Sequence, residues 1–296
     1  MKNPFKHILA GLDLSGMDEQ VLQYLNLIQP KEEPSPVTLV HVAEAGMAPM
    51  YAMSPAAPVL AGAAGAGMPE AALRLESQQM LRPDLPQTEI EVVQGGLREL
   101  LRLAEDRDID LAVLGRKDAV HGAGILPMRF LRHSGCSVLF VPEVAPARLR
   151  RIVVGTDFSD ASMIAYRKAV QLAARLDPAP EVLVAHFYEV DPELAWGLDR
   201  TAALEADAAA RQEAATRSLE SFMLLAHTTG LTVKGLAVPD SYFSPALHLK
   251  ELAESVRADL VVVGAHGRVP FPAFLLGSVT EKFLYYNQVI ASLIVR

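Results

Sequence analysis

The sequence has a single cysteine, Cys136, among 296 residues, so no disulfide can form within the chain. This cysteine usage is typical of a reducing, cytoplasmic compartment. Hydrophobic runs are short: none approaches the length needed to span a bilayer. The first residues, MKNPFKHILAGLD, also lack the continuous apolar core of a signal peptide. We therefore expect a cytoplasmic protein that does not enter a membrane.

Positive charge is also scarce, with 27 Lys and Arg against 35 Asp and Glu, a net charge of −8 and a pI near 5.5. This balance argues against nucleic acid or an anionic membrane as a partner.

Several catalytic signatures are missing too: there is no Walker loop, no Rossmann G-x-G-x-x-G, no G-x-S-x-G nucleophile motif and no His/Cys/Asp/Glu cluster at metal-binding spacing. Familiar nucleotide-hydrolysing and serine-nucleophile classes are therefore not indicated.

The sequence contains an internal repeat that divides it into two similar halves. About half of the residues (51%) are hydrophobic, and the length suits two average domains with sizeable cores. Four blocks recur in the same order at a similar offset. The pairs are HILAGLDLS (7–15) with RIVVGTDFS (151–159), VTLVHV (37–42) with EVLVAHF (181–187), IDLAVLGR (109–116) with ADLVVVGA (258–265), and CSVLFV (136–141) with IASLIV (290–295).

Each half reads as alternating strands and helices. In the first half the expected strands lie near 6–12, 36–43, 88–94, 110–114 and 137–141, and the expected helices near 16–29, 69–82, 95–107 and 127–133. The second half repeats this order, with a longer alanine-rich helix near 199–228. The pattern predicts an α/β fold of two tandem flavodoxin-like (Rossmann-like) domains, each a five-stranded parallel sheet with helices on both faces.

The proline-containing segment Pro142–Arg148 indicates a linker, so we predict domains at 1–147 and 148–296. A second irregular segment, Gly46–Pro69, is built from Ala, Gly, Pro and Met without any period. It is interpreted as a flexible insertion. The alternative is a methionine-rich loop that packs on a partner or covers the site.

The most informative stretch is GAHGRVPFPAFLLGSVTE, residues 264–281. Gly264 and Gly267 follow an apolar strand, and Gly277 and Ser278 precede a pattern typical of a helix N-terminus. Free backbone N–H groups and the positive end of the helix dipole favour an anion such as phosphate at that point. Ser278 and Thr280 could add hydroxyl donors.

Topology brings a second feature to the same place. In a parallel sheet wound like flavodoxin, ligands bind beyond the carboxyl ends of the strands, where the strand order reverses. The first and fourth strands of the second half end near Asp157 and Gly264. Asp157 could be a turn or cap residue, or its carboxylate could bind a polar edge of a nucleoside. It could also contact Mg²⁺, but no second carboxylate is evident beside it, so metal ligands stay undefined.

The spacing Gly-x-x-Gly, nine residues, Gly-Ser resembles the motif of the nucleotide-binding universal stress proteins, whose wider pattern also fits VVVGAHGR and LLGSVTEKFL. The resemblance covers nearly the whole chain in two copies. It implies an adenine-nucleotide-hydrolase-like fold, ATP as ligand and a role in stress response. It also implies a set of binding residues: Gly155, Asp157, Phe187, Gly264, Gly267, Gly277, Ser278 and Val279, the last through its backbone N–H. His186 is interpreted as structural and His266 as a solvent-facing loop residue.

The first half keeps Asp13 and Gly115 but departs from the motif elsewhere. Asp118 replaces the second glycine, and Met128 and Arg129 replace the Gly-Ser pair. A carboxylate would repel phosphate, and a side chain at Met128 would obstruct the backbone. We predict that this half binds ATP poorly or not at all. It would instead pair with the second half within the chain, and a homodimer is an open alternative.

Three functions remain open at this point. The first is an ATP-binding regulatory protein with at most weak hydrolysis, because no positioned base, cationic clamp or metal site is evident. The second is a slow ATPase or phosphotransferase, and the third is a nucleotide-free interaction scaffold.

Overall fold

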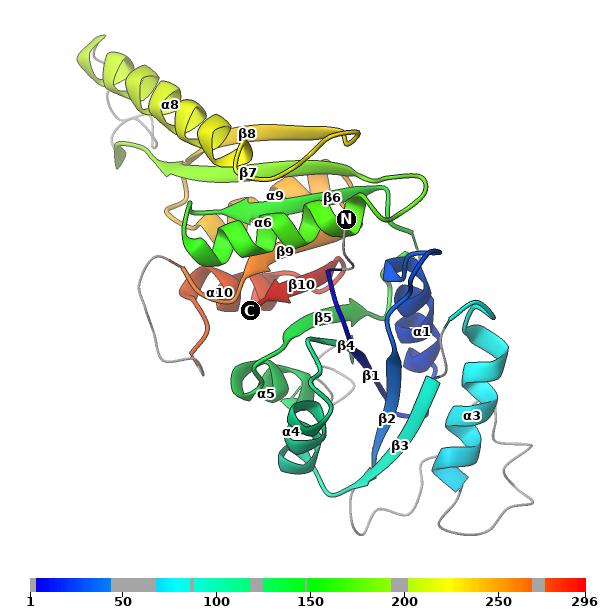
Figure 1. Ribbon diagram of the computed structural model, residues 1–296. Helices are drawn as coiled ribbons and strands as arrows, with labels where there is room; N and C mark the ends of the chain where they lie inside the picture. The colour runs from blue at the N-terminus through cyan, green and yellow to red at the C-terminus, as the bar shows by residue number, and fades with distance from the viewer. Residues whose placement is uncertain are drawn as a thin grey trace. The chain divides into compact units, whose positions relative to one another are not determined.

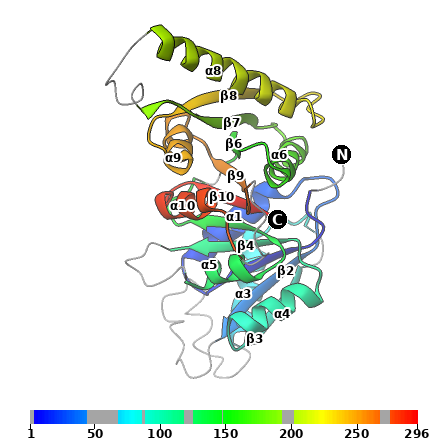
Figure 2. The same ribbon diagram turned by 90° about the vertical axis from the view of Figure 1, so that its left-hand side faces the viewer.

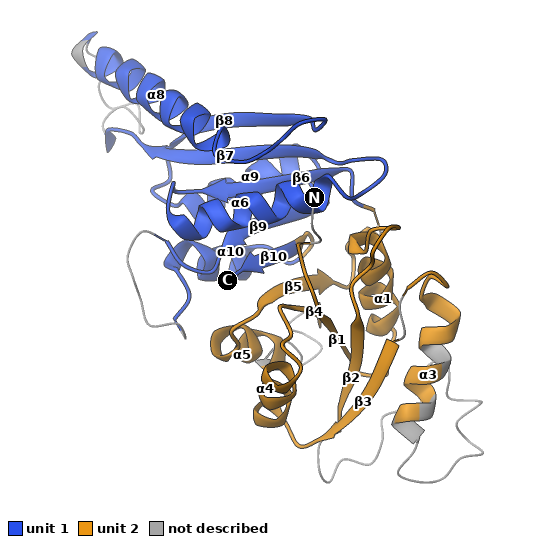
Figure 3. Ribbon diagram, viewed as in Figure 1, with its two compact units in different colours: residues 1, 149–288, 292–296 blue, residues 2–148, 289–291 orange. Residues whose placement is uncertain are grey.

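The computed structural model describes residues 4–43, 68–85, 88–117, 125–146, 148–192, 202–267 and 275–296. The chain divides into two compact units (Figure 3). We call the N-terminal one, residues 2–148 and 289–291, the first unit; it is drawn orange as unit 2. The second unit, residues 149–288 and 292–296 together with residue 1, is drawn blue as unit 1. Most of the irregular Gly46–Pro69 segment lies outside the described residues, so both interpretations of it stay open. Its last two residues begin a helix. No helix in the described ranges is long and apolar enough to cross a membrane.

The first unit is a five-stranded sheet in the order β3-β2-β1-β4-β5, with parallel pairing throughout. Helices α1 and α3 lie on one face, α4 and α5 on the other (Figure 1). The strands are β1 (Ile8–Leu12), β2 (Val37–Ala43), β3 (Thr88–Gln94), β4 (Leu111–Arg116) and β5 (Ser137–Pro142). The helices are α1 (Met17–Ile28), α3 (Met68–Met80), α4 (Leu97–Asp106) and α5 (Ile125–His133).

The second unit has the same winding, in the order β8-β7-β6-β9-β10. Helices α6 and α8 lie on one face, α9 and α10 on the other (Figures 1 and 2). The strands are β6 (Arg151–Thr156), β7 (Glu181–Glu189), β8 (Val233–Asp240), β9 (Leu260–Gly264) and β10 (Ala291–Val295). The helices are α6 (Asp160–Ala173), α8 (Ala202–Met223), α9 (Pro245–Ser255) and α10 (Ser278–Tyr286).

The predicted α/β fold is confirmed. In each unit the first strand lies between the second and the fourth, so the strand order reverses there. Strands β5, β9 and β10 are buried along their whole length. Because helices cover both faces, these strands read as continuous apolar runs without a polar alternation. The crevice expected at the strand reversal follows from this winding.

A buried or half-buried aspartate anchors the first strand of each unit. In the first unit the backbone N–H groups of Lys6 and His7 donate to the carboxylate of Asp110. In the second, the N–H groups of Arg150 and Arg151 donate to Asp259 at 2.8 and 3.1 Å. Each aspartate immediately precedes the fourth strand of its unit. Its hydrogen bonds therefore fix the register between the first strand and the fourth, which are neighbours in the sheet.

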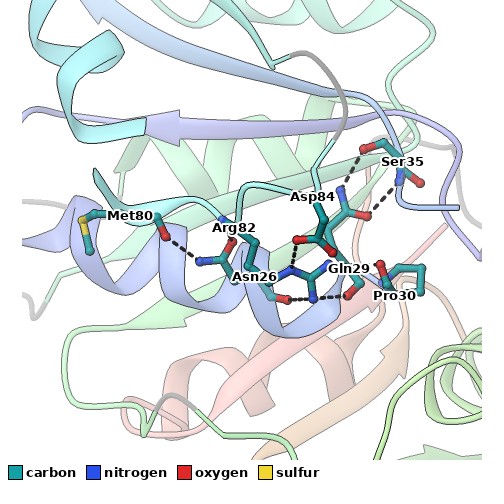
Figure 4. Close-up of polar contacts among 7 residues, drawn as sticks. All are labelled: Asn26, Gln29, Pro30, Ser35, Met80, Arg82 and Asp84. Atoms are coloured by element: carbon teal, nitrogen blue, oxygen red, sulfur yellow. Dashed lines mark hydrogen bonds and ion pairs between the residues drawn. The ribbon is translucent and has the colours of Figure 1, made fainter. Parts of the chain in front are cut away.

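Side-chain amides and one arginine close the C-terminal end of α1 (Figure 4). The Asn26 amide donates to the Met80 carbonyl and accepts from the Arg82 N–H. Arg82 in turn donates from its guanidinium to the carbonyls of Asn26, Gln29 and Pro30. These carbonyls end a helix and lack intrahelical partners, and a cation there also meets the negative end of the helix dipole.

Replacing Arg82 by alanine should therefore lower the free energy of unfolding by about 1–3 kcal/mol, the usual effect of removing a charged donor from carbonyls. Urea denaturation measures it. The matched control is Arg74→Ala, because Arg74 is 60% exposed and pairs with Glu70 on its own helix; there we expect a change of about 0.5 kcal/mol or less. Equal losses in the two variants would contradict this role for Arg82.

Candidate nucleotide site

A pocket of about 1100 Å³ opens at the carboxyl edge of the sheet in the second unit. It is comparable to the upper end of small-molecule sites. All eight residues predicted for the site line it: Gly155, Asp157, Phe187, Gly264, Gly267, Gly277, Ser278 and Val279. The structure thus brings residues from β6, β7, β9 and α10 to one place.

Gly264 is required by packing within the protein. A β-carbon on Gly264 would lie 2.9 Å from the carbonyl carbon of Ala161 in the first turn of α6. The carbonyl of Gly264 also accepts a 2.7 Å hydrogen bond from the hydroxyl of Thr280, which is buried. That hydroxyl, expected to donate to a ligand, instead ties α10 to the end of β9.

Gly267 and Gly277 lie against each other. A β-carbon on Gly277 would be 3.3 Å from the backbone nitrogen of Gly267, and the Gly277 N–H donates to the Ala265 carbonyl at 2.8 Å. Helix α10 begins directly after Gly277. The backbone N–H groups of Ser278 and Val279 meet no acceptor elsewhere in the described chain, as helix geometry dictates for a first turn. Both residues are exposed.

Asp157 faces this loop from the end of β6. Its Oδ1 accepts from the backbone N–H of Ser159 at 3.1 Å and from the Ser159 hydroxyl at 2.5 Å. Its Oδ2 lies 3.0 Å from where a β-carbon on Gly267 would stand. Ser159 caps α6 by accepting from the N–H of Ser162. One carboxylate oxygen of Asp157 therefore stabilises the turn before α6, while the other points toward Gly267.

Phe187 lines the pocket with its ring nearly parallel to that of His248, at a centroid distance of 5.7 Å and an angle of 14°. Gly155 packs tightly, because a β-carbon there would lie 3.1 Å from Leu249 and 3.2 Å from Val263. His186 is structural, as predicted: its Nδ1 is 2.9 Å from the Thr156 carbonyl oxygen.

His266 is partly buried, whereas the sequence indicated a solvent-facing residue. Burial and the charge of Arg296 both lower the pKa of its imidazole. Its Nε2 lies 3.4 Å from an Arg296 guanidinium nitrogen. Since an arginine can only donate, Nε2 is the acceptor in this contact.

The sequence profile of the Universal stress protein family matches the chain twice, at residues 4–142 and 148–285. The chain belongs to the universal stress protein family. A universal stress protein of Methanocaldococcus jannaschii is 29% identical over 135 residues, which cover 46% of this chain and 75% of that protein.

Solved structures share the two-domain fold of this universal stress protein. One from Archaeoglobus fulgidus has a TM-score of 0.63 at 15% identity, covering 99% of this chain and 97% of the other. A universal stress protein from Pseudomonas aeruginosa, described as putative, has a TM-score of 0.59 at 13% identity, covering 98% and 93%. At these identities the likeness concerns the fold alone.

The equivalent crevice of the first universal stress protein domain differs in two ways. Lys117 follows β4 and places its Nζ 2.5 Å from Oδ2 of Asp13, the counterpart of Asp157. The repeat aligns Arg129 with Ser278, yet α5 already begins at Ile125, so no helix starts at the aligned position. Asp118, proposed to repel phosphate, lies outside the described residues.

Several pocket residues were missed from the sequence. Arg211 reaches the pocket from α8, and Phe158 and Phe243 line it as well. Both phenylalanines have positive φ, 65° and 52°, which no local sequence signal indicated. Lys117 was missed too, although its alignment with His266 could have revealed it. Among the described residues, no group of three or more His, Cys, Asp or Glu could hold a metal ion.

Gly264→Ala should destabilise the ligand-free protein by about 1–3 kcal/mol, because its methyl group would press on backbone atoms of α6. Thermal or chemical denaturation without ligand measures this. Gly135→Ala is the control, since a β-carbon there meets nothing within 4 Å. Full stability of Gly264→Ala would show that α6 can move away and that this glycine is not a packing requirement.

Lys117→Gln should raise the pKa of the Asp13 carboxyl. Burial raises this pKa, but hydrogen bonds from Lys117 and Ser15 and the lysine charge outweigh it, and the net shift is downward. The ion pair therefore contributes stability above the unfolded pKa of about 4, and this contribution is lost as the pH falls through the lower folded pKa. Carboxyl NMR titration measures the shift. Lys250→Gln, which removes a pair with Glu254, should leave Asp13 unchanged.

Proposed function

We propose that the second domain of this universal stress protein binds ATP in its pocket, and that the protein acts in stress response as a nucleotide-dependent regulatory or protective factor. The observation that supports this most is the backbone arrangement at Gly267, Gly277 and Ser278. Gly267 and Gly277 let two backbone segments approach closely, and the adjacent helix start offers N–H donors and a positive dipole.

The charges that line the pocket would determine how the nucleotide is oriented in it. Its lining carries carboxylates at Asp157, Glu189 and Asp240, which accept hydrogen bonds from hydroxyl and amino groups but repel phosphate. The phosphates would therefore lie at the start of α10, against Ser278 and the Val279 N–H. The nucleoside would extend toward Asp157, Gly155 and Phe187.

The first domain is proposed to have a structural role. Lys117 already neutralises Asp13, and the helix start that would supply N–H donors is displaced. We propose domains at 1–147 and 148–296 that pair within one chain, with homodimer formation as a further possibility. A cytoplasmic location is proposed from the single, buried cysteine.

Binding without rapid turnover is the preferred form of this function. Phosphoryl transfer needs a positioned base and cations that neutralise the developing charge. The described lining contains one arginine, Arg211, and this side chain pairs with Asp207. Asp157 would be the residue to contact Mg²⁺, if the ion enters with ATP. ADP release by the wild-type protein of about one per second or faster would instead indicate an enzyme.

Ser278→Asp should weaken ATP binding while leaving the fold intact. An acidic residue in the first turn suits the helix dipole, and Ser278 is exposed, but the added charge would face the phosphates. We expect a loss of at least about tenfold in affinity, from one repulsive contact of ~1.4 kcal/mol or more. Isothermal titration calorimetry with ATP measures it.

The matched control is Arg129→Asp at the aligned, exposed position of the first domain, which should leave ATP affinity unchanged. Gly277→Asp provides a second disruption, by bulk and charge together. If Ser278→Asp and Gly277→Asp both bound ATP like the wild type, the site assignment would be wrong. Equal losses in Ser278→Asp and Arg129→Asp would place the ligand outside the second domain.

A further inference from the structure

Asp240, at the end of β8, is a buried carboxylate that lines the pocket, and 4% of the residue is exposed. Its Oδ1 accepts from the backbone N–H of Ser244 at 2.9 Å and lies 3.3 Å from Nε2 of His248. No residue in the described part of the chain donates a hydrogen bond to its Oδ2. Burial of a carboxylate is costly unless hydrogen bonds satisfy it. Oδ2 is therefore suited to accept a hydrogen bond from a ligand.

The contacts of Oδ1 orient this side chain. The Ser244 N–H comes from the loop between β8 and α9, and His248 lies on α9. The imidazole of His248 is itself fixed by two nearly parallel rings, with centroids 5.7 Å away for Phe187 and 4.5 Å away for Tyr242. Oδ1 of Asp240 thus faces the loop and the helix, which leaves Oδ2 as the oxygen for the pocket.

Strand pairing places Asp240 beside Phe187. In the register of β7 and β8, Phe187 pairs with Val238 and Glu189 pairs with Asp240. Because alternate residues of a strand lie on one face of the sheet, Phe187 and Asp240 share a face on neighbouring strands. Both side chains also lie against His248. A base that packs on Phe187 would therefore present its edge to Asp240.

Asp240 is also far from the start of α10. The strand order β8-β7-β6-β9 puts three strand spacings between the ends of β8 and β9, which is roughly 14 Å at about 4.8 Å per spacing. The proposed phosphate position at Ser278 follows β9, at the opposite end of the pocket. A carboxylate at the end of β8 would therefore meet the base and not the phosphates.

We propose that Oδ2 of Asp240 accepts a hydrogen bond from the exocyclic amino group of adenine and thereby determines the preference for this base. This inference rests on the proposed function, since it concerns the base end of the same pocket. An ionised carboxylate can only accept hydrogen bonds, and the amino group of adenine donates one.

The other purines fit this carboxylate less well. Hypoxanthine and guanine carry a carbonyl oxygen where adenine has its amino group, and two acceptors that face each other repel. Guanine has two neighbouring N–H donors on the same edge, which suit a carboxylate with both oxygens open. In Asp240, Oδ1 already accepts from Ser244, so one oxygen remains and a single donor fits it.

The first test compares ATP with ITP, which carries hypoxanthine in place of adenine, by isothermal titration calorimetry on the wild-type protein. We expect ATP to bind at least about tenfold more tightly, because ITP would leave a buried acceptor unpaired. Inorganic triphosphate, which has no base, reports on the phosphate end separately. Equal affinities for ATP and ITP would overturn the proposal without any variant.

Asp240→Asn exchanges the free acceptor for a donor. The Ser244 N–H holds the amide oxygen, since the reverse orientation would place two donors against each other. The amide NH₂ then stands where Oδ2 was, and it donates to ITP but no longer accepts from ATP. We expect the ratio of ATP to ITP affinity to fall at least about tenfold. Triphosphate affinity should stay within about twofold, because the lost charge lies more than a screening length away.

The matched control is Glu251→Gln, which removes the same charge from an exposed position on α9 and should leave the ratio unchanged. Equal falls in the two variants would show an effect of net charge and overturn the proposal. Melting temperatures of the ligand-free proteins check the fold. If Asp240→Asn does not fold, the comparison of ATP with ITP on the wild-type protein still decides.

The remaining outcomes separate this inference from the proposed function. If wild-type protein binds ATP and Asp240→Asn keeps the wild-type ratio, base recognition by Asp240 is wrong while the nucleotide site stands. If the variant loses inorganic triphosphate as strongly as ATP, Asp240 supports the whole pocket and its role in base recognition is overturned. If the wild-type protein binds neither nucleotide nor triphosphate, the proposed function fails and this inference fails with it.

Discussion

The close approach of backbone segments at the end of β9 is the constraint on which the second domain depends. Gly264 lies against the first turn of α6, and its carbonyl accepts a hydrogen bond from the Thr280 hydroxyl. Gly277 lies against Gly267. The Gly277 N–H is held by Ala265 as well. These contacts fix where α10 begins. Under the proposed function they would position the first-turn N–H groups in advance, which would lower the entropic cost of binding an anion.

The two domains share structural devices that go beyond the sequence blocks. Asp110 and Asp259 anchor equivalent strands through two backbone N–H groups each. His41 and His186 place Nδ1 against the carbonyl at the end of the first strand, at 3.0 and 2.9 Å. These contacts lie inside each sheet and occur in both domains, whereas the crevices differ at Lys117 and at the start of α5. Framework and ligand pocket are thus separable parts of this fold.

Much of the fold could be predicted from the sequence, because buried parallel strands and amphipathic helices leave strong periodic signals. The helix predicted near 127–133 was less accurate: it begins at Ile125. The predicted residues line one pocket, and their role in binding stays a prediction. The structure also gives some of them a different role from the expected one. Gly264 is a packing glycine and Thr280 an internal tie, and both depend on how α6 and α10 meet β9. Such contacts between distant segments leave no local pattern. Phe243 and Lys117 escaped notice for the same reason.

The early start of α5 at Ile125 has an evolutionary consequence. If the first domain does not bind nucleotide, as proposed, a binding variant of it would need a shorter helix, a glycine in place of Met128 and the removal of the lysine that pairs with Asp13. No single substitution makes all three changes. A mutation that disabled the pocket of the second domain could therefore not be compensated by one change in the first.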